Sequence, residues 1–285
     1  MITQRHAKIV LSLLLMTLVG GCINSTKKTE ANKISFDSIV VDKAYHLLEN
    51  DSNPNCNLQI KFTYPVKYKD PAILKNIQQI FVDSYFGEEY ASLSPAEAVE
   101  KYTTDYINAY KDLEQDYKKD VEKARATNGQ VGAWYSYYEM SSNDIVYNEN
   151  NILSFVNRLE NYTGGAHGAH AVTNHVINLK TGKLITEQDI FVADYQDTLA
   201  KLLVNKIAAQ NNVKDPKELE NAGFFSVEEI YPNGNFLVKE DGIVYTFNEY
   251  EIAAYVVGQT KVFLPYNELQ LVLRKDSPIS QLTAI

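Results

Sequence analysis

Two histidines and three glycines lie within residues 161–170, which read NYTGGAHGAH. Histidine side chains bind zinc, and a catalytic zinc needs three protein ligands with a fourth position left open. The histidines that a metal site here would use are His167, His170 and the nearby His175. In an extended strand, residues three apart point to opposite faces, so His167 and His170 converge only if the glycines bend the chain. Such a site would also need a carboxylate from elsewhere, such as Glu187.

This glycine-histidine segment has three interpretations. The first is a turn or bulge that joins two strands, for which the glycines supply the backbone geometry. The second is a loop that contacts a ligand. The candidate contact residues of that loop are Tyr162, Gly164, Gly165, His167, Gly168 and His170. The third is a metal or catalytic site. The strand-joining turn is favoured, and we expect no metal ligand, no cofactor and no catalytic residue.

Other catalytic signatures are missing from the sequence. It contains neither the Gly-x-Ser-x-Gly turn of serine hydrolases nor the Gly-x-x-x-x-Gly-Lys loop that binds phosphates. Cys56 alternates with apolar residues in NCNLQIKFTYP, a pattern that favours a buried structural thiol over a nucleophile. A glycan-cleaving pair of carboxylates stays open, because the sequence does not show which acids lie close together.

The first 22 residues have the three parts of a bacterial lipoprotein signal. A short basic start is followed by the apolar run 9–19 and then by Gly20-Gly21-Cys22. We therefore expect residues 1–21 to be removed and Cys22 to be lipidated. The alternatives are an ordinary signal peptide or an uncleaved anchor. The polar residues 22–33 are predicted to form a flexible tether between the membrane and the folded chain.

The predicted mature chain is strongly acidic. Residues 1–21 carry two basic side chains and no acidic one, so 25 basic and 36 acidic side chains remain, giving a net charge of −11. This charge argues against nucleic acid as a partner and would suit a cationic one. The length and the apolar content fit one large or two small domains.

Hydrophobic periodicity divides the first half into strands and helices. Alternation predicts strands at 34–48, 56–66, 131–139, 144–147 and 152–162. Helical spacing predicts a helix from Asp70-Pro71 to Gly87, and a longer one that begins at the capping box of Ser94 and Glu97 and ends near Gly129. Residues 34–162 are therefore predicted to form one α+β domain.

The second half also reads as a mixture of strands and helices. It is predicted to contain a strand at 170–179, a helix around 199–208, a hairpin about Asp241-Gly242 and a last strand at 261–265. Residues 163–275 are predicted to form a second α+β domain, and residues 276–285 a tail. The expected fold class is α+β, with mostly antiparallel sheets packed against a few helices.

Several short sequence motifs of this chain occur together in a known family. They are YTGGAHG at 162–168, NLKTGK at 178–183, DGIVYTFNEYEIAAY at 241–255 and LPYNEL at 264–269. In this order they resemble the extracytoplasmic module of RsiV-type anti-sigma factors, and also the non-catalytic N-terminal region of PdaC-type peptidoglycan deacetylases. The resemblance covers nearly all of residues 34–270.

The resemblance implies a function in binding. In the anti-sigma relatives this module is a receptor for lysozyme, but only eight residues precede the apolar run here and no deacetylase domain follows residue 270. We therefore expect a non-catalytic module on a lipid anchor that binds a lysozyme-like protein or peptidoglycan. The expected location is the cell envelope, on the outer membrane facing the periplasm. The alternative is an envelope enzyme that acts on peptidoglycan or another glycan, with a metal at His167 and His170.

Overall fold

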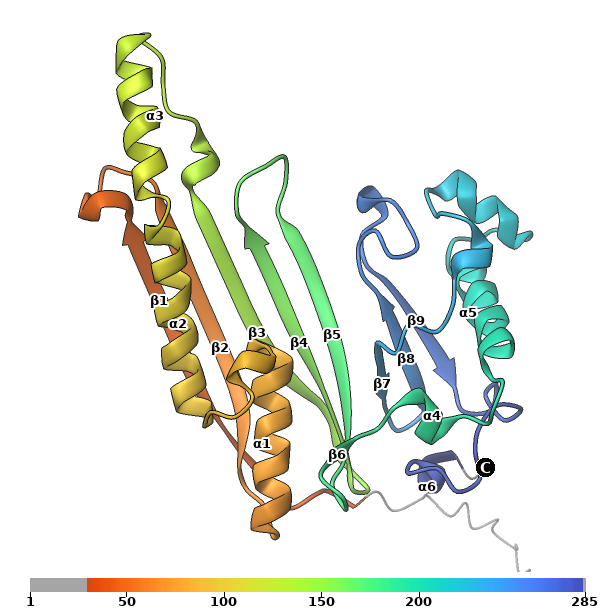
Figure 1. The fold of residues 1–285 in the computed structure, drawn as a ribbon. Coiled ribbons are helices and arrows are strands. Elements are labelled where there is room, and N and C mark those ends of the chain that lie inside the picture. Colours follow the sequence, from red (N-terminus) through yellow and green to blue (C-terminus); the bar gives the residue numbers. More distant parts are fainter. Residues whose placement is uncertain (1–29, 284–285) are drawn as a thin grey trace, which may run out of the picture.

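A computed structural model describes residues 30–283, and Figure 1 shows their arrangement around two β-sheets. The larger sheet contains β1 (Ser35–His46), β2 (Asn55–Lys67), β3 (Tyr137–Glu149), β4 (Ile152–Tyr162), β5 (Ala169–Asn178) and β6 (Lys183–Leu184). The smaller sheet contains β7 (Phe236–Val238), β8 (Gly242–Phe247) and β9 (Thr260–Pro265). The predicted signal segment, including Cys22, lies outside the described residues.

The helices flank these sheets. They are α1 (Pro71–Phe86), α2 (Pro95–Lys111), α3 (Glu114–Ala126), α4 (Glu187–Ile190), α5 (Gln196–Gln210) and α6 (Ser280–Thr283). Figure 1 shows α1 and α2 on one face of the larger sheet, and α5 beside the smaller sheet. Between residues 30 and 283, none of the helices is long and apolar enough to cross a membrane.

The larger sheet is antiparallel except at one position. Its strands follow the order β1-β2-β3-β4-β5-β6, and only β2 and β3 run parallel. A parallel neighbour needs a crossover connection, and α1, α2 and α3 supply it. The predicted α+β class with mostly antiparallel sheets is confirmed.

The helix starts follow the capping signals of the sequence. The Asp70 side chain accepts hydrogen bonds from the first turn of α1, and Ser94 and Glu97 form a capping box at α2. The long helix expected up to Gly129 is divided, because the chain turns at 112–113 between α2 and α3. Just after this turn, the Glu114 carboxylate accepts hydrogen bonds from the Tyr45 hydroxyl and the Leu48 amide.

Another difference lies at the start of β3. The strands expected at 131–139 and 144–147 are one strand, which begins at Tyr137 after a short 3-10 helix at 133–135. Tyr135 in this 3-10 helix is buried, and its carbonyl accepts a hydrogen bond from the Tyr110 hydroxyl of α2. Residues 133–135 therefore pack against the helices and do not pair as a strand.

Apolar side chains form a core on each side of the larger sheet. The core under α1 and α2 includes Ile60, Phe62 and Phe81. A second core lies between α5 and the smaller sheet and takes in Ile152 and Val176 of the larger sheet. The predicted burial of Cys56 is confirmed, and this burial raises the pKa of its thiol.

The division into units differs from the predicted boundaries. Strand β5 pairs with β4 along its whole length, so the boundary expected between residues 162 and 163 falls inside a hairpin of the larger sheet. The predicted tail contributes Ile279 and Leu282 to the second core. At the other end, Asn32 of the predicted tether donates a backbone hydrogen bond to the Asn148 carbonyl. Glycine-rich and polar segments look alike in sequence whether they link domains or end strands.

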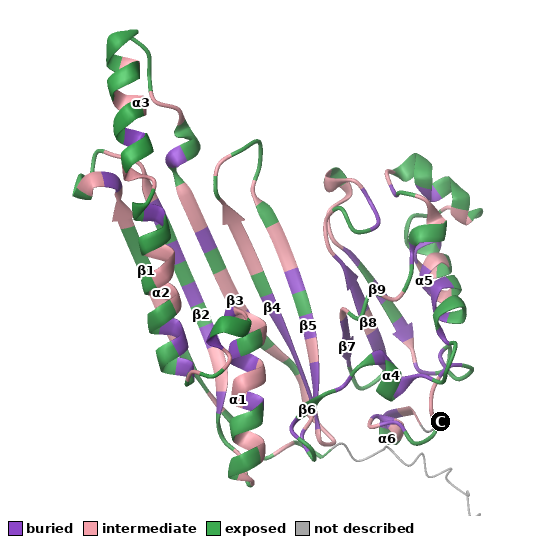
Figure 2. Cartoon of the chain, in the orientation of Figure 1, coloured by how far each residue is buried: buried purple, intermediate pink, exposed green. Residues whose placement is uncertain are grey.

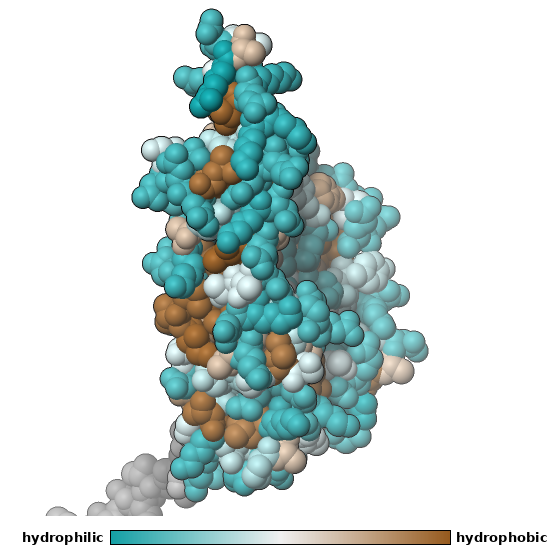
Figure 3. Space-filling view, turned by 60° about the vertical axis from the view of Figure 1, so that its left-hand side comes forward, coloured by the Kyte–Doolittle hydropathy of each residue, from teal (hydrophilic) through white to brown (hydrophobic). Residues whose placement is uncertain are grey.

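The larger sheet is covered unevenly. Near β6 it lies between α1 on one face and β7 on the other, and buried residues dominate both β4 and β5 there (Figure 2). Toward the loop between β4 and β5, the face opposite the helices has no such cover (Figure 1). Hydrophilic residues dominate the side of the molecule that is turned forward in Figure 3. The uncovered part of the larger sheet is thus the part of this sheet that is open to a ligand.

Candidate functional site

The glycine-histidine segment is the loop that joins β4 to β5. Gly164 and Gly165 have φ angles of 91° and 112°, which side chains rarely allow. A Cβ atom at Gly168 would lie 2.9 Å from the Asn161 carbonyl oxygen. The Tyr162 hydroxyl closes the loop by donating to the Gly165 carbonyl at 2.9 Å. The expected strand-joining turn is what the structure shows.

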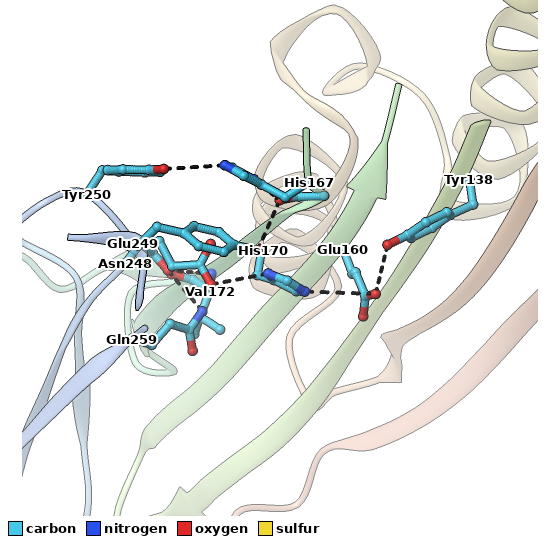
Figure 4. Close-up of polar contacts among 11 residues, drawn as sticks. Tyr138, Glu160, His167, His170, Val172, Asn248, Glu249, Tyr250 and Gln259 are labelled. Atoms are coloured by element: carbon cyan, nitrogen blue, oxygen red, sulfur yellow. Dashed lines mark hydrogen bonds and ion pairs between the residues drawn. The ribbon is translucent and has the colours of Figure 1, made fainter. Parts of the chain in front are cut away.

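We call the part of the chain with α4, α5, α6 and the smaller sheet the C-terminal unit. His167 connects the loop to segment 248–259 of this unit. Its ring stacks on Tyr255 with the centroids 4.1 Å apart. Its Nδ1 lies 2.9 Å from the Gly168 carbonyl oxygen, and its Nε2 lies 3.4 Å from the Tyr250 hydroxyl. Because a carbonyl only accepts, Nδ1 carries the hydrogen in this arrangement. Figure 4 shows the contact between the Tyr250 hydroxyl and the His167 ring.

His170 lies between two carboxylates from different parts of the chain (Figure 4). Its Nδ1 is 3.2 Å from Glu249 Oε1, and its Nε2 is 3.8 Å from Glu160 Oε1. Glu160 also accepts a hydrogen bond from the Tyr138 hydroxyl at 3.1 Å. The His170 side chain on β5 therefore joins Glu160 on β4 to Glu249 of the C-terminal unit.

Two asparagines complete this junction by pairing with the outer edge of β5. Asn248 Oδ1 accepts from the Val172 amide at 2.8 Å, and its Nδ2 donates to the Val172 carbonyl at 3.0 Å. Asn235 accepts from the Asn174 amide and also donates to the Val172 carbonyl. The side-chain amides thus replace a neighbouring strand. No sequence signal pointed to this role, because the partners are more than sixty residues apart.

Beside this junction, a groove of about 770 Å³ lies on the uncovered face of the larger sheet. Strands β1 to β5 form its floor, and Glu249 and Gln259 line it from the C-terminal unit. Its charged side chains are Asp42, Lys61, Arg158, Glu160 and Glu249. Val40 on its floor is 71% exposed. The groove combines apolar and polar groups, as ligand sites do.

Aromatic side chains gather around the glycine-histidine loop, which connects the strands of the groove residues Glu160 and His170. We call Trp134, Tyr162, His167, Tyr250 and Tyr255 the rim. Trp134 is 54% exposed and Tyr250 is 57% exposed. The backbone of Trp134 approaches Gly164 so closely that a Cβ atom there would lie 3.1 Å from its carbonyl oxygen. The rim therefore brings together the 3-10 helix before β3, the loop between β4 and β5, and the C-terminal unit.

The histidines do not share one site. His167 and His170 have the separate partners described above, and the His175 ring stacks on Phe155 with the centroids 4.9 Å apart. Burial lowers the pKa of His175 to about 4. Within residues 30–283, no group of three or more His, Cys, Asp or Glu side chains is arranged to hold a metal ion. Glu187 accepts hydrogen bonds from the Tyr195 and Tyr245 hydroxyls, apart from the rim.

Comparisons with known proteins agree with this arrangement. Residues 50–170 match the family described as deacetylase PdaC, and residues 188–267 match the family of unknown function DUF3298. The resemblance expected from the sequence is thereby confirmed. The junction brings together Glu160 and His170 of the first matched region and Glu249 of the second. No curated protein matches the chain.

Two solved structures share the fold. A DUF3298 family protein from Pseudomonas aeruginosa has a TM-score of 0.56 and 13% identity over 86% of this chain and 97% of its own, which shows the fold alone. A member of the DUF3298 family from Bacteroides fragilis has a TM-score of 0.82 and 33% identity, with 89% of this chain and 98% of its own covered. At that identity over nearly the whole length, the chain belongs to the DUF3298 family.

Proposed function

We propose that this protein is a non-catalytic binding module of the bacterial cell envelope, whose partner is an envelope protein or glycan. Lysozyme-like enzymes are the first candidates, because the sequence resembles the module that binds lysozyme in RsiV-type anti-sigma factors. The observation that carries the proposal is the groove with its aromatic rim. The rest of the chain serves to hold that surface in place.

The rim has the composition of a recognition surface. Tyrosine and tryptophan provide a large contact area with a polar tip, and they are enriched where binding energy is concentrated. Trp134 and Tyr250 are more than half exposed, although each belongs to a residue type that is mostly buried on average. Nearby, Val256 is 89% exposed. These exposed side chains come from both units, so the rim exists only when the units are packed together.

Charge supports a basic partner. The predicted mature chain has a net charge of −11, and such a charge speeds the encounter with a basic protein without making it specific. In the groove, Arg158 is already paired with Asp144, while Glu160 and Glu249 share only His170 and neutral groups. A cationic group of a partner could therefore form ion pairs with Glu160 and Glu249.

The test is a titration of lysozyme onto the chain lacking residues 1–21 and carrying Cys22→Ser. Binding should saturate at one to one, persist at physiological salt, where charges are screened beyond about 8 Å, and inhibit muramidase activity. Binding that vanishes at this salt would reveal only charge attraction. Absence of binding at low salt as well would remove lysozyme and leave purified peptidoglycan fragments as the next ligand to titrate.

The rim can be tested by substitution. Trp134→Ala and Tyr250→Ala should each weaken binding about tenfold or more, because each removes a large exposed contact. Tyr231→Ala is the matched control, since Tyr231 is 47% exposed but lies with Asp197 and Lys201 beside α5. Equal losses in the control and in the rim variants would contradict the proposed surface.

The lipid anchor at Cys22 is a proposal from the sequence. If Cys22 is acylated, Cys22→Ala should abolish lipid labelling and release the protein from the outer membrane fraction or leave it unprocessed. A Cys22→Ala protein that keeps its membrane association, its mass and its lipid label would contradict the anchor.

A second candidate function is that of an enzyme that acts on peptidoglycan or another glycan. The observation in its favour is His170 between Glu160 and Glu249 in the groove, because carboxylates and imidazoles serve as general acids and bases. It predicts soluble products from peptidoglycan that disappear in His170→Ala. The metal-assisted form also predicts stoichiometric zinc in protein purified without chelator.

A further inference from the structure

A second, smaller pocket lies on the opposite face of the larger sheet from the groove. Its volume is about 180 Å³, and it is lined by Ser84, Tyr85, Tyr102, Glu139, Ser141 and Asn157, among others. Glu139 on β3 is the register partner of Leu58 on β2, whose side chain belongs to the core under the helices. The Glu139 carboxylate therefore points toward the helices, away from Glu160 and the rim.

This pocket presents acceptors that are only partly used. Glu139 is 7% exposed, and its Oε1 accepts a hydrogen bond from the Tyr102 hydroxyl at 2.6 Å. No described residue donates a hydrogen bond to its Oε2. Asn157 is also 7% exposed; its Nδ2 donates to the Ser84 carbonyl at 2.8 Å, which leaves its Oδ1 without a partner. Buried polar groups are nearly always paired, so the unpaired Asn157 Oδ1 beside the free Glu139 Oε2 points to a missing donor.

The charge of the pocket indicates which donor is missing. An ionised carboxylate is costly to bury unless a cation or several hydrogen bonds compensate it. Among the described residues, no cationic side chain forms an ion pair with Glu139; Arg158, which also lines the pocket, is paired with Asp144. Burial raises the pKa of Glu139, and the hydrogen bond from Tyr102 opposes this rise. A positively charged donor would therefore gain more at this position than a neutral one.

The size and walls of the pocket limit the ligand. A cavity of about 180 Å³ is smaller than the roughly 300–1,000 Å³ of sites for drug-sized ligands. Leu159 and Ala171 add apolar wall, and the exposed Thr173 places the opening over β5. A protonated amine has three donors and no acceptor, which suits the two free acceptors Glu139 Oε2 and Asn157 Oδ1.

We propose that this pocket binds a primary ammonium group on a short aliphatic stem, with Glu139 Oε2 accepting from the ammonium and Leu159 and Ala171 packing on the stem. The site opens on the other face of the sheet from the groove, although Ser141, Arg158, Leu159 and Ala171 line both, and it does not depend on the function proposed above.

The test is calorimetric titration of the chain lacking residues 1–21, carrying Cys22→Ser, with butylamine and with 1-butanol, which has a similar shape and no charge. Butylamine should bind at one to one, and butanol at least tenfold more weakly. Glu139→Gln should weaken butylamine binding at least tenfold, because the amide keeps the acceptor for Tyr102 but removes the charge. Glu122→Gln on the exposed side of α3 changes the total charge equally and should have no effect.

The pH dependence gives a readout that does not require a variant to fold. The amine stays protonated up to about pH 10, so affinity should rise with pH as Glu139 ionises and then level off. In Tyr102→Phe the hydrogen bond that lowers the pKa of Glu139 is lost, so the midpoint of this rise should move to higher pH. Glucosamine and N-acetylglucosamine, titrated in parallel, distinguish a sugar-borne amine from an aliphatic one.

Three results would overturn the proposal. They are equal affinity for butylamine and butanol, undiminished butylamine binding by a folded Glu139→Gln protein, and no detectable binding of butylamine at millimolar concentration. The last result would mean that the pocket holds water only. None of these results bears on lysozyme or glycan binding at the rim.

Discussion

The two halves of β4 have different surroundings, although they belong to one continuous strand. Residues 152–157 are buried on both faces, with Phe155 under α1 and Ser154 donating a hydrogen bond to the Val238 carbonyl of β7 at 2.7 Å. Residues 158–162 are exposed or half-buried, and Glu160 faces the groove. The first half lies between two layers, whereas the second half is covered on one face only.

This difference shows how the fold makes a site. Where the smaller sheet packs on β4, the strand is part of the core and offers no side chain to the groove. Where the smaller sheet turns away, the same strand offers Arg158 and Glu160 to the groove. The rim lies where the two units touch again, through His167 and Tyr255. Stability should therefore depend on the first half of β4, and binding on the second.

The largest effect is expected from Phe155→Ala in the buried half. The Phe155 ring stacks on Phe81 with the centroids 4.0 Å apart and also contacts His175. Removing it leaves a cavity, which should lower the free energy of unfolding by about 3–5 kcal/mol. Tyr162→Ala in the other half is the control and should cost much less. Chemical unfolding of both variants measures the difference, and equal losses would contradict the comparison.

The next effect depends on pH and concerns His175, the neighbour of Phe155. Burial lowers the pKa of His175 to about 4 from its usual value of about 6.5. The unfolded chain therefore binds a proton at a pH where the folded chain does not, so stability should fall as the pH drops from 6.5 to 4 and then level off. At about 1.4 kcal/mol per pKa unit, the loss is at most about 3.5 kcal/mol. His175→Phe keeps the stacked ring and cannot titrate, so its unfolding curve should lack this component. An unchanged pH profile in this variant would contradict the assignment.

Much of the local structure follows from the sequence. Alternation predicted β1, β2 and β4, and the capping residues Asp70 and Ser94 marked the starts of α1 and α2. These features depend on residues that are close together in the chain. Alternation also shows which side chains share a face of a strand. It does not show what covers that face, and so the contrast between the two halves of β4 was not predictable.

The candidate site was predicted in part. The sequence pointed to the loop with His167 and His170, because glycines at such spacing mark a bent backbone. It did not show that Tyr250, Glu249 and Asn248 lie against this loop, since these contacts join residues about eighty positions apart. Such contacts are fixed by the packing of the two units, which no local pattern records.

A smaller effect is expected where the two units are joined at β5. Asn235→Ala removes the partner of the Asn174 amide and one of the two donors to the Val172 carbonyl, which keeps its hydrogen bond from Asn248. Leaving the partly buried Asn174 amide unpaired should lower the free energy of unfolding by about 1–3 kcal/mol. Hydrogen exchange should accelerate at the amide of Asn174, which loses its partner. Asn205→Ala on the exposed side of α5 is the control and should leave exchange in β5 unchanged. If exchange at Asn174 is also unchanged in Asn235→Ala, the asparagine does not hold this edge.

The smallest effect on stability is expected at the rim, although the effect on binding there should be large. Tyr250 is 57% exposed, and among residues 30–283 its hydroxyl makes only the long contact of 3.4 Å with His167. Tyr250→Ala should therefore change the free energy of unfolding by no more than about 0.5 kcal/mol. If the rim is the binding surface, the same variant loses partner affinity while its unfolding curve matches that of the unsubstituted chain. If Tyr250→Ala instead lost as much stability as Asn235→Ala, Tyr250 would be a structural contact between the units. The separation between the stabilising half and the binding half of β4 would then not extend to the rim.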